Sequence, residues 1–230
     1  MIKSSIASII DHTLLKPVAR RSEIEALCRE KFIFNFRSVC VNSANVAICE
    51  RVCEELDMAS VNICSVIGFP LGAMHTEAKL AEADCAISDG ATELDLMINL
   101  SWLLEDEIRP LRALRKELKY FANKAKNYNV ISKLIIETGL LTNPQKVLAC
   151  ELAVEAGFDF VKTCTGFNGG GATVEDIRLM RETIGSQTLI KASGGIKDLA
   201  TVRAMLAAGA DVIGTSSGVN IVAEETAENS

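Results

Sequence analysis

The sequence of 230 residues has little of what marks several large classes of protein. It contains no run of basic residues, and 24 Lys and Arg against 30 Asp and Glu give a formal net charge of −6. This balance argues against a nucleic-acid-binding or polybasic membrane surface. No segment approaches ~18 uninterrupted apolar residues, and the N-terminal stretch lacks the apolar core and cleavage site of a secretion signal. We therefore expect a cytoplasmic protein with neither a nucleic acid nor a membrane as its partner.

Signatures of metal and nucleotide sites are also missing. The only histidines are His12 and His75, and no HExxH occurs, so no zinc site is expected. The 8 cysteines include no CxxC pair and lie mostly in apolar patterns, which is typical of reduced packing residues. No GxGxxG follows the first β-rich run, and no P-loop is present.

What the sequence does contain is an alternation of short β-rich runs with longer amphipathic stretches. The β-rich runs are 8–11, 38–41, 61–67, 93–99, 133–137, 158–163, 188–193 and 211–216. Several intervening stretches begin with Ser, Thr, Asn or Asp and end with Gly, as helices do. Because each parallel strand needs a crossover helix, the alternation predicts an α/β fold, a single-domain (β/α)₈ TIM barrel over residues 1–230. The alternative is a doubly wound open sheet.

Two lysines occupy positions where strands should bury hydrocarbon. Lys162 follows Phe160 and Val161 in the sixth run, and Lys191 lies in the seventh. A buried ammonium group must find a counter-charge, reach water or lose its proton. A single lysine of this kind is typically paired or reaches solvent. Two on adjacent strands disfavour each other's protonation, which leaves a neutral amine able to form a Schiff base with a carbonyl.

Acidic residues near these lysines extend the candidate site. Asp95 alternates with Leu94 and Leu96 in the fourth run, so it faces away from both leucines. Its carboxylate could neutralise a buried lysine, relay protons, or do both. Lys133 and Glu93 open their runs, so we expect both towards the opposite rim of the barrel, with structural roles.

Glycine-rich turns follow the seventh and eighth runs, at 193–198 and 214–218. Many barrels bind phosphate at these two positions through backbone N–H groups and a helix N-terminus. A helix N-terminus allows an acidic protein to hold an anion without a basic patch. Together the two turns predict a phosphate site.

Nine stretches match one known family, in order and across nearly the whole chain. They are DHTLLKP (11–17), VCVN (39–42), VIGFPLG (66–72), ELDLMIN (93–99), KLIIET (133–138), DFVKTCTGF (159–167), GGAT (170–173), KASGGIK (191–197) and GTSSG (214–218). In these stretches the sequence resembles the deoxyribose-phosphate aldolases. The resemblance implies a class I aldolase that cleaves 2-deoxy-D-ribose 5-phosphate to D-glyceraldehyde 3-phosphate and acetaldehyde, without metal or organic cofactor. It also implies a homodimer or homotetramer.

The resemblance further implies roles for individual residues. Lys162 would be the Schiff-base lysine, while Lys191 would disfavour its protonation and share proton transfers with Asp95. The residues implied to bind substrate, mostly on phosphate turns, are Gly166, Gly194, Gly195, Gly214, Ser216, Ser217, Asp11, Thr13 and Cys40.

The sequence departs from the family pattern at two places. Cys164 stands where the family commonly has serine, and strand alternation predicts that its thiol lies on the same side as Lys162. Some members end in a tyrosine that reaches the site, whereas this tail reads AEETAENS and the only tyrosines are Tyr120 and Tyr128. Either the proton relay is simpler here or the tail is disordered.

Three other functions fit parts of the same pattern. Another Schiff-base aldolase or a transaldolase would use the same lysine. Only a comparison of substrates separates such an enzyme from a deoxyribose-phosphate aldolase. A cofactor-free phosphosugar isomerase would use a carboxylate base, so it would survive loss of Lys162. A non-catalytic phosphosugar-binding barrel would bind the sugar without forming a carbonyl adduct.

Overall fold

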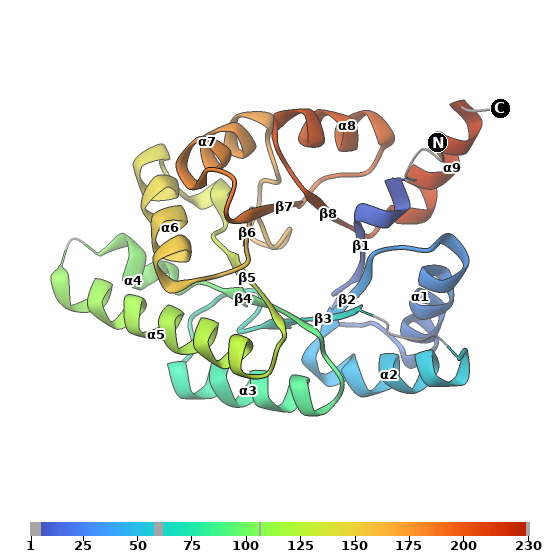
Figure 1. Ribbon diagram of the computed structural model, residues 1–230, viewed down its shortest axis with the longest axis horizontal. Coiled ribbons are helices and arrows are strands. Elements are labelled where there is room, and N and C mark those ends of the chain that lie inside the picture. Colours follow the sequence, from blue (N-terminus) through green and yellow to red (C-terminus); the bar gives the residue numbers. More distant parts are fainter. Residues whose placement is uncertain (1–5, 58–61, 106, 229–230) are drawn as a thin grey trace.

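The computed structural model describes residues 6–57, 62–105 and 107–228. In this part of the chain, parallel strands close into a barrel in sequence order, with β8 paired to β1. Figure 1 shows the helices arranged around the outside of the strands. The strands are β1 (Ile10–Leu14), β2 (Ser38–Asn42), β3 (Asn62–Ile67), β4 (Glu93–Met97), β5 (Ile131–Ile135), β6 (Phe160–Lys162), β7 (Leu189–Ser193) and β8 (Val212–Thr215). The predicted (β/α)₈ barrel is confirmed, and the open sheet is excluded.

Helices follow the strands around the barrel. Main helices are α1 (Arg21–Phe34), α2 (Val46–Glu55), α3 (Thr76–Ser88), α4 (Leu100–Leu104), α5 (Ile108–Asn127), α6 (Asn143–Ala156), α7 (Val174–Ile184), α8 (Leu199–Ala208) and α9 (Gly218–Glu228). Short 3₁₀ turns are η1 (Ile6–Ile9), η2 (Ser43–Asn45) and η3 (Thr138–Leu140). None of the helices in the described ranges is long and apolar enough to span a membrane.

Several helices carry the end signals that the sequence indicated, because these signals are local. The side chains of Thr173 and Asp198 accept hydrogen bonds from backbone N–H groups in the first turns of α7 and α8. Thr142 caps α6 in a capping box. Gly157 and Gly209 end α6 and α8 in the left-handed conformation, which glycine adopts at little cost.

The first strand was predicted at 8–11 but runs later in the chain. Residues 6–9 form η1, and the strand continues through Asp11, His12 and Thr13. The apolar pattern missed these residues because a buried carboxylate and imidazole look unfavourable without their partners. Those partners, Arg37 for Asp11 and Glu30 for His12, come from distant positions. Val61 at the start of the third predicted run lies outside the described residues, as do residues 1–5, 106 and 229–230 of the predicted domain.

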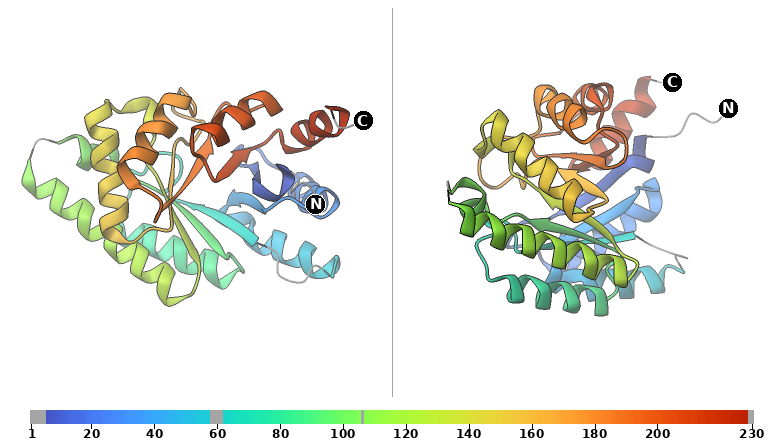
Figure 2. Two further views of the ribbon diagram at one scale, coloured as in Figure 1. Left: turned by 45° about the horizontal axis from the view of Figure 1, so that its top comes forward. Right: turned by 60° about the vertical axis from the view of Figure 1, so that its left-hand side comes forward.

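Strand alternation separates an apolar layer from a polar interior. Leu94 and Leu96 of β4 belong to the large apolar cluster, whereas Asp95 between them contacts lysines from other strands inside the barrel. The first and last described elements, η1 and α9, lie beside each other (Figure 2), and the Ile6 N–H donates to a carboxylate oxygen of Glu225 on α9 at 3.2 Å. Asp95 therefore lies in the charged interior, on the face that alternation predicted.

Candidate active site

A cavity of about 330 Å³ opens at the C-terminal ends of the strands. Its lining contains Lys162, the side chain of which is only 3% exposed. The glycine-rich turns that follow β6, β7 and β8 supply much of the wall. The lining residues are Thr13, Leu14, Leu15, Lys16, Lys162, Thr165, Gly166, Phe167, Ser193, Gly194, Gly195, Ile196, Lys197, Gly214, Thr215 and Ser216.

Six charged side chains inside the barrel form a closed ring in which carboxylates and cations alternate. Neighbouring members are joined by ion pairs of 2.5 to 2.8 Å. In order, the ring runs Arg37, Asp11, Lys191, Asp95, Lys133 and Glu93, and it returns to Arg37. Each ring charge has opposite charges on both sides, which is what a low-dielectric interior requires. In their usual charged forms, the three carboxylates and three cations sum to zero.

Lys162 is attached to this ring without belonging to it. Its Nζ lies 2.8 Å from Oδ2 of Asp95, and the Nζ of Lys191 lies 2.8 Å from the same oxygen. The two amines are close because Lys162 and Lys191 are directly paired residues in the hydrogen-bonded ladder between β6 and β7. Lys162 thus shares one carboxylate oxygen with a ring lysine while it also lines the cavity.

The ring also fixes the charge of its members. Burial by itself would raise the pKa of Asp95, but the three lysines around it outweigh burial and hold that pKa well below its ordinary value. Burial would likewise lower the pKa of Lys191, but Asp11 and Asp95 outweigh it and raise that pKa well above the ordinary lysine value. Asp95 and Lys191 are therefore charged at neutral pH.

Lys133 does not lie at the far rim as its sequence position suggested. The strand β5 begins at Ile131, so Lys133 lies inside the strand, directly paired with Asp95 in the ladder. The predicted run began only at residue 133, because Ser132 is polar and does not look like a buried strand residue. Its N–H and hydroxyl both donate to Asp159, and these hydrogen bonds allow it to be buried in the strand. Sequence reasoning thus missed one of the lysines that contact Asp95.

Several residues predicted to bind substrate do line the cavity, and others do not. Thr13, the four predicted glycines and Ser216 are in the lining, but Asp11, Cys40 and Ser217 are not. Asp11 is instead a ring member that also accepts from the hydroxyl of Ser38 at 2.6 Å. Cys40 packs beside Cys64 behind the cavity wall. Lys16 and Lys197 were not singled out, although both lie in the matching stretches and contribute cations to the wall.

Two glycines of the wall, Gly194 and Gly214, are required by close approach. A Cβ on Gly194, which has a φ of 90°, would lie 3.1 Å from both Cys164 Cβ and Gly171 Cα. At Gly214, a Cβ would come within 2.9 Å of Lys191 Cε. Gly214 thus makes room for a ring lysine in addition to lining the cavity.

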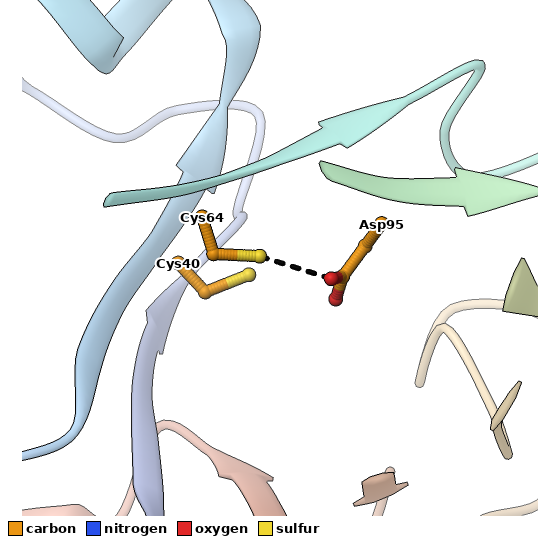
Figure 3. A group of neighbouring side chains, drawn as sticks. All are labelled: Cys40, Cys64 and Asp95. Atoms are coloured by element: carbon orange, nitrogen blue, oxygen red, sulfur yellow. Dashed lines mark hydrogen bonds between the residues drawn. The ribbon is translucent and has the colours of Figure 1, made fainter. Parts of the chain in front are cut away.

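Cys40 and Cys64 lie next to Asp95 inside the barrel (Figure 3). Their possible metal-ligating atoms lie within 4.8 Å of one another, and sulfur ligands suit soft metals. Burial raises the pKa of Cys64 well above its ordinary value, and that thiol donates to Asp95 at 3.0 Å. Because the carboxylate of Asp95 already has three lysine partners, these charges disfavour a divalent cation here.

The two departures from the family pattern are located as follows. Cys164 is fully buried against Thr138, with burial raising the pKa of its thiol, and it is not part of the cavity lining. Since β6 ends at Lys162, alternation does not extend to Cys164, and the prediction that it faces the site is wrong. The tail is helical as far as Glu228, and neither Tyr120 nor Tyr128 lines the cavity.

Comparisons with known proteins identify the family. A family model described as "DeoC/LacD family aldolase" matches residues 5–224. The chain belongs to this family. Deoxyribose-phosphate aldolase 1 of Bacillus licheniformis is 49% identical over 223 residues, covering 97% of this chain and 97% of that protein. The deoxyribose-phosphate aldolase of Carboxydothermus hydrogenoformans is 49% identical and covers 96% of each.

Solved structures of aldolases share the fold of this DeoC/LacD family member. The structure of a deoxyribose phosphate aldolase from Aeropyrum pernix, described as a unique tetramer, matches with a TM-score of 0.88 at 33% identity. It covers 97% of this chain and 92% of that one. A structure titled "QR15, an Aldolase" matches with a TM-score of 0.89 at 37% identity, covering 100% of this chain and 98% of that one. The family resemblance predicted from the motifs is confirmed.

Replacing Asp95 with asparagine should expose the energetic role of the ring. At pH 7 the variant should lose about 3–5 kcal/mol of unfolding free energy, because three lysines lose a shared counter-charge. The pKa of Asp95 is depressed in the folded protein, so its contribution is complete above about pH 4 and disappears as pH falls further. The difference between wild type and variant should therefore narrow in urea titrations carried from pH 7 to pH 3.

A matched control is Asp84→Asn, which removes the exposed partner of Lys124. This variant should lose less than about 1 kcal/mol of unfolding free energy, as expected for an ion pair on the surface. A loss for Asp95→Asn as small as this control, or one that is constant with pH, would contradict the role assigned to the ring.

Proposed function

We propose that this chain cleaves 2-deoxy-D-ribose 5-phosphate to D-glyceraldehyde 3-phosphate and acetaldehyde through a Schiff base on Lys162. The observation that carries the proposal is the amine of Lys162, which reaches the cavity while resting 2.8 Å from a carboxylate that a second lysine shares. Family membership and the curated relatives named deoxyribose-phosphate aldolase agree with it.

The proposed chemistry needs a nucleophile and a proton carrier. The free amine of Lys162 attacks C1 of the open-chain sugar, and loss of water leaves a protonated imine. Removal of the proton from the C3 hydroxyl then breaks the C2–C3 bond. The electron pair moves toward the iminium nitrogen and gives an enamine, while glyceraldehyde 3-phosphate leaves. Protonation of the enamine at C2 and hydrolysis of the imine release acetaldehyde and restore the amine.

The ring supplies groups suited to these proton transfers. Asp95 contacts both Lys162 and Lys191 and is therefore placed to relay a proton between the amine and the substrate. Lys191 keeps a positive charge beside the nucleophile, which disfavours protonation of Lys162 and stabilises developing negative charge on oxygen. Neither role requires a metal or an organic cofactor.

The phosphate of the substrate is proposed to lie against the turns that follow β6, β7 and β8. Gly166, Gly194 and Gly195 have φ values of 81°, 90° and 75°, which only glycine adopts readily. Turns of this type direct backbone N–H groups toward an anion. Lys16 and Lys197 line the same cavity and add positive charge.

Borohydride reduction in the presence of deoxyribose 5-phosphate should leave one stable adduct, on Lys162, because reduction converts an imine to a secondary amine. Lys162→Leu should give no adduct at any pH. In Lys191→Leu, the reduced adduct should form slowly at pH 7 and faster at higher pH. The proposed reason is that removal of the neighbouring cation allows Lys162 to retain its proton. Peptide mass analysis after single-turnover trapping checks these outcomes.

The control for this experiment is Lys146→Leu, which removes a lysine paired with Asp176 outside the cavity, and it should trap like wild type. Circular dichroism would establish that each variant is folded. An adduct mainly on Lys191 or Lys16 would reject the assignment. Sugar binding without any adduct would indicate a non-catalytic barrel, and activity that survives Lys162→Leu would indicate an isomerase that uses a carboxylate base.

Ser216→Leu should weaken the phosphorylated sugar selectively. Ser216 lines the cavity beside Gly214, so a bulky side chain there would displace the phosphate. We expect KM for deoxyribose 5-phosphate to rise by at least about tenfold, the size of a lost charge-assisted hydrogen bond, and KM for plain deoxyribose to change little. The matched comparison is Ser217→Leu at the neighbouring position outside the lining, which should have a smaller effect. Equal losses for both sugars would make the turn structural.

We further propose that the chain forms a homodimer or homotetramer. The aldolase structure from Aeropyrum pernix is described as a tetramer, and this chain covers 92% of it. Exposed apolar side chains such as Val18, Phe32 and Ile33 are suited to contacts between copies. Light scattering of the purified protein should give a mass two or four times 24.8 kDa, whereas a monomer mass at micromolar concentration would contradict this. The cytoplasmic location expected from the sequence stays a prediction.

A further inference from the structure

Glu137 has an unusual backbone beside the proposed nucleophile. It is fully buried, yet its φ of 56° lies in the left-handed region that non-glycine residues seldom adopt. The N–H groups of its neighbours Ile136 and Thr138 donate to the carbonyl oxygens of Lys162 and Thr163, at 3.0 and 3.1 Å. Two residues on this side therefore oppose one on the other, which is the pattern of a β-bulge. A bulge redirects a side chain, and here the redirected side chain is a carboxylate.

The carboxylate of Glu137 is directed into the turn that follows β6, residues 165–168. Oε1 accepts from the N–H of Thr165 at 3.0 Å, and Oε2 accepts from its hydroxyl at 2.5 Å and from Asn168 Nδ2 at 2.9 Å. The same hydroxyl of Thr165 accepts from the N–H of Phe167 at 3.0 Å. Each of these contacts of the carboxylate is with a donor, and together they determine the shape of the turn.

This turn forms part of the cavity wall and is also connected to another loop. Thr165, Gly166 and Phe167 line the cavity, whereas Glu137 itself does not. Asn168 donates a further hydrogen bond to the carbonyl of Pro70 at 3.1 Å, and the ring of Phe167 meets that of Phe69 edge-on, with centroids 5.2 Å apart. Glu137 thus joins the loops that follow β3, β5 and β6.

We propose that Glu137 is a positioning residue that sets the affinity for the phosphorylated sugar. It holds the turn 165–168 so that Gly166 packs beside Gly194 in the cavity wall, where a Cβ added to Gly166 would lie 3.8 Å from Gly194 Cα. It takes no part in the bond-breaking steps. This inference rests on the proposed function for the identity of the ligand, but the shape of the turn does not depend on that function.

The decisive variant is Glu137→Gln, which keeps the size of the side chain. Because the carboxylate faces donors on both oxygens, the amide NH₂ would meet a donor in either orientation, and at least one hydrogen bond would be lost. We expect KM for deoxyribose 5-phosphate to rise by about tenfold, the effect of one buried hydrogen bond. kcat should stay within about threefold, and KM for plain deoxyribose should not change. Hydrogen exchange at residues 163–170 should become faster while the rest of the barrel keeps its protection.

The matched control is Asp159→Asn at the other end of the same two strands. Asp159 also accepts from a backbone N–H and a hydroxyl, those of Ser132, at 2.8 and 2.9 Å. It lies far from the cavity lining, so its variant should leave both KM values and the exchange of residues 163–170 as in wild type. If Glu137→Gln does not fold, Asn168→Leu removes one tether of the same turn and should show the same selective rise in KM.

Two results would overturn the proposal. One is wild-type KM and wild-type exchange in a folded Glu137→Gln or Asn168→Leu protein. The other is an equal loss for phosphorylated and plain deoxyribose, which would make Glu137 a support for the barrel alone. Failure of the proposed function would be seen separately, as absence of a borohydride adduct on wild type. In that case, hydrogen exchange and calorimetric binding of deoxyribose 5-phosphate to each variant would still test the positioning role.

Discussion

The structure depends on one carboxylate, Asp95, which several buried ammonium groups share. Lys133, Lys162 and Lys191 each place their Nζ 2.8 Å from one of its oxygens. Placing any of these lysines in the barrel without this anion would cost several kcal/mol. The other ring members complete the compensation, since Asp11 and Glu93 supply the remaining negative charge. Hence the interior can carry a dense set of charges while the six ring members stay balanced.

The ring also gives different partners to two lysines that are paired in one ladder. Lys191 lies between Asp11 and Asp95, and this raises its pKa and keeps it charged. Lys162 contacts only Asp95 among the ring members and is the lysine that reaches the cavity. Lys191 and Lys162 are thus distinguished by their ion-pair partners and not by burial, since both side chains are almost completely buried.

The charged interior and the cavity wall rest on different kinds of structure. The charges of Asp95, Lys162 and Lys191 lie on strands, where the hydrogen-bonded ladder fixes their spacing. Much of the cavity wall lies on loops, and loops need separate supports to hold one shape. The bulge at Glu137 is such a support, because it connects the end of β5 with the turn after β6.

The sequence by itself determined the alternation of strands and helices, the helix caps, and the interior positions of Asp95, Lys162 and Lys191. These depend on local periodicity and on end signals that act within a few residues. Tertiary structure decided which charges meet. It placed Lys133 beside Asp95 instead of at the far rim, joined Asp11 to Lys191 in the ring, and buried Cys164 outside the cavity lining. Asp95 and Lys191 are 96 positions apart in the chain, and the energy of a buried charge depends on such distant partners, which no local pattern encodes.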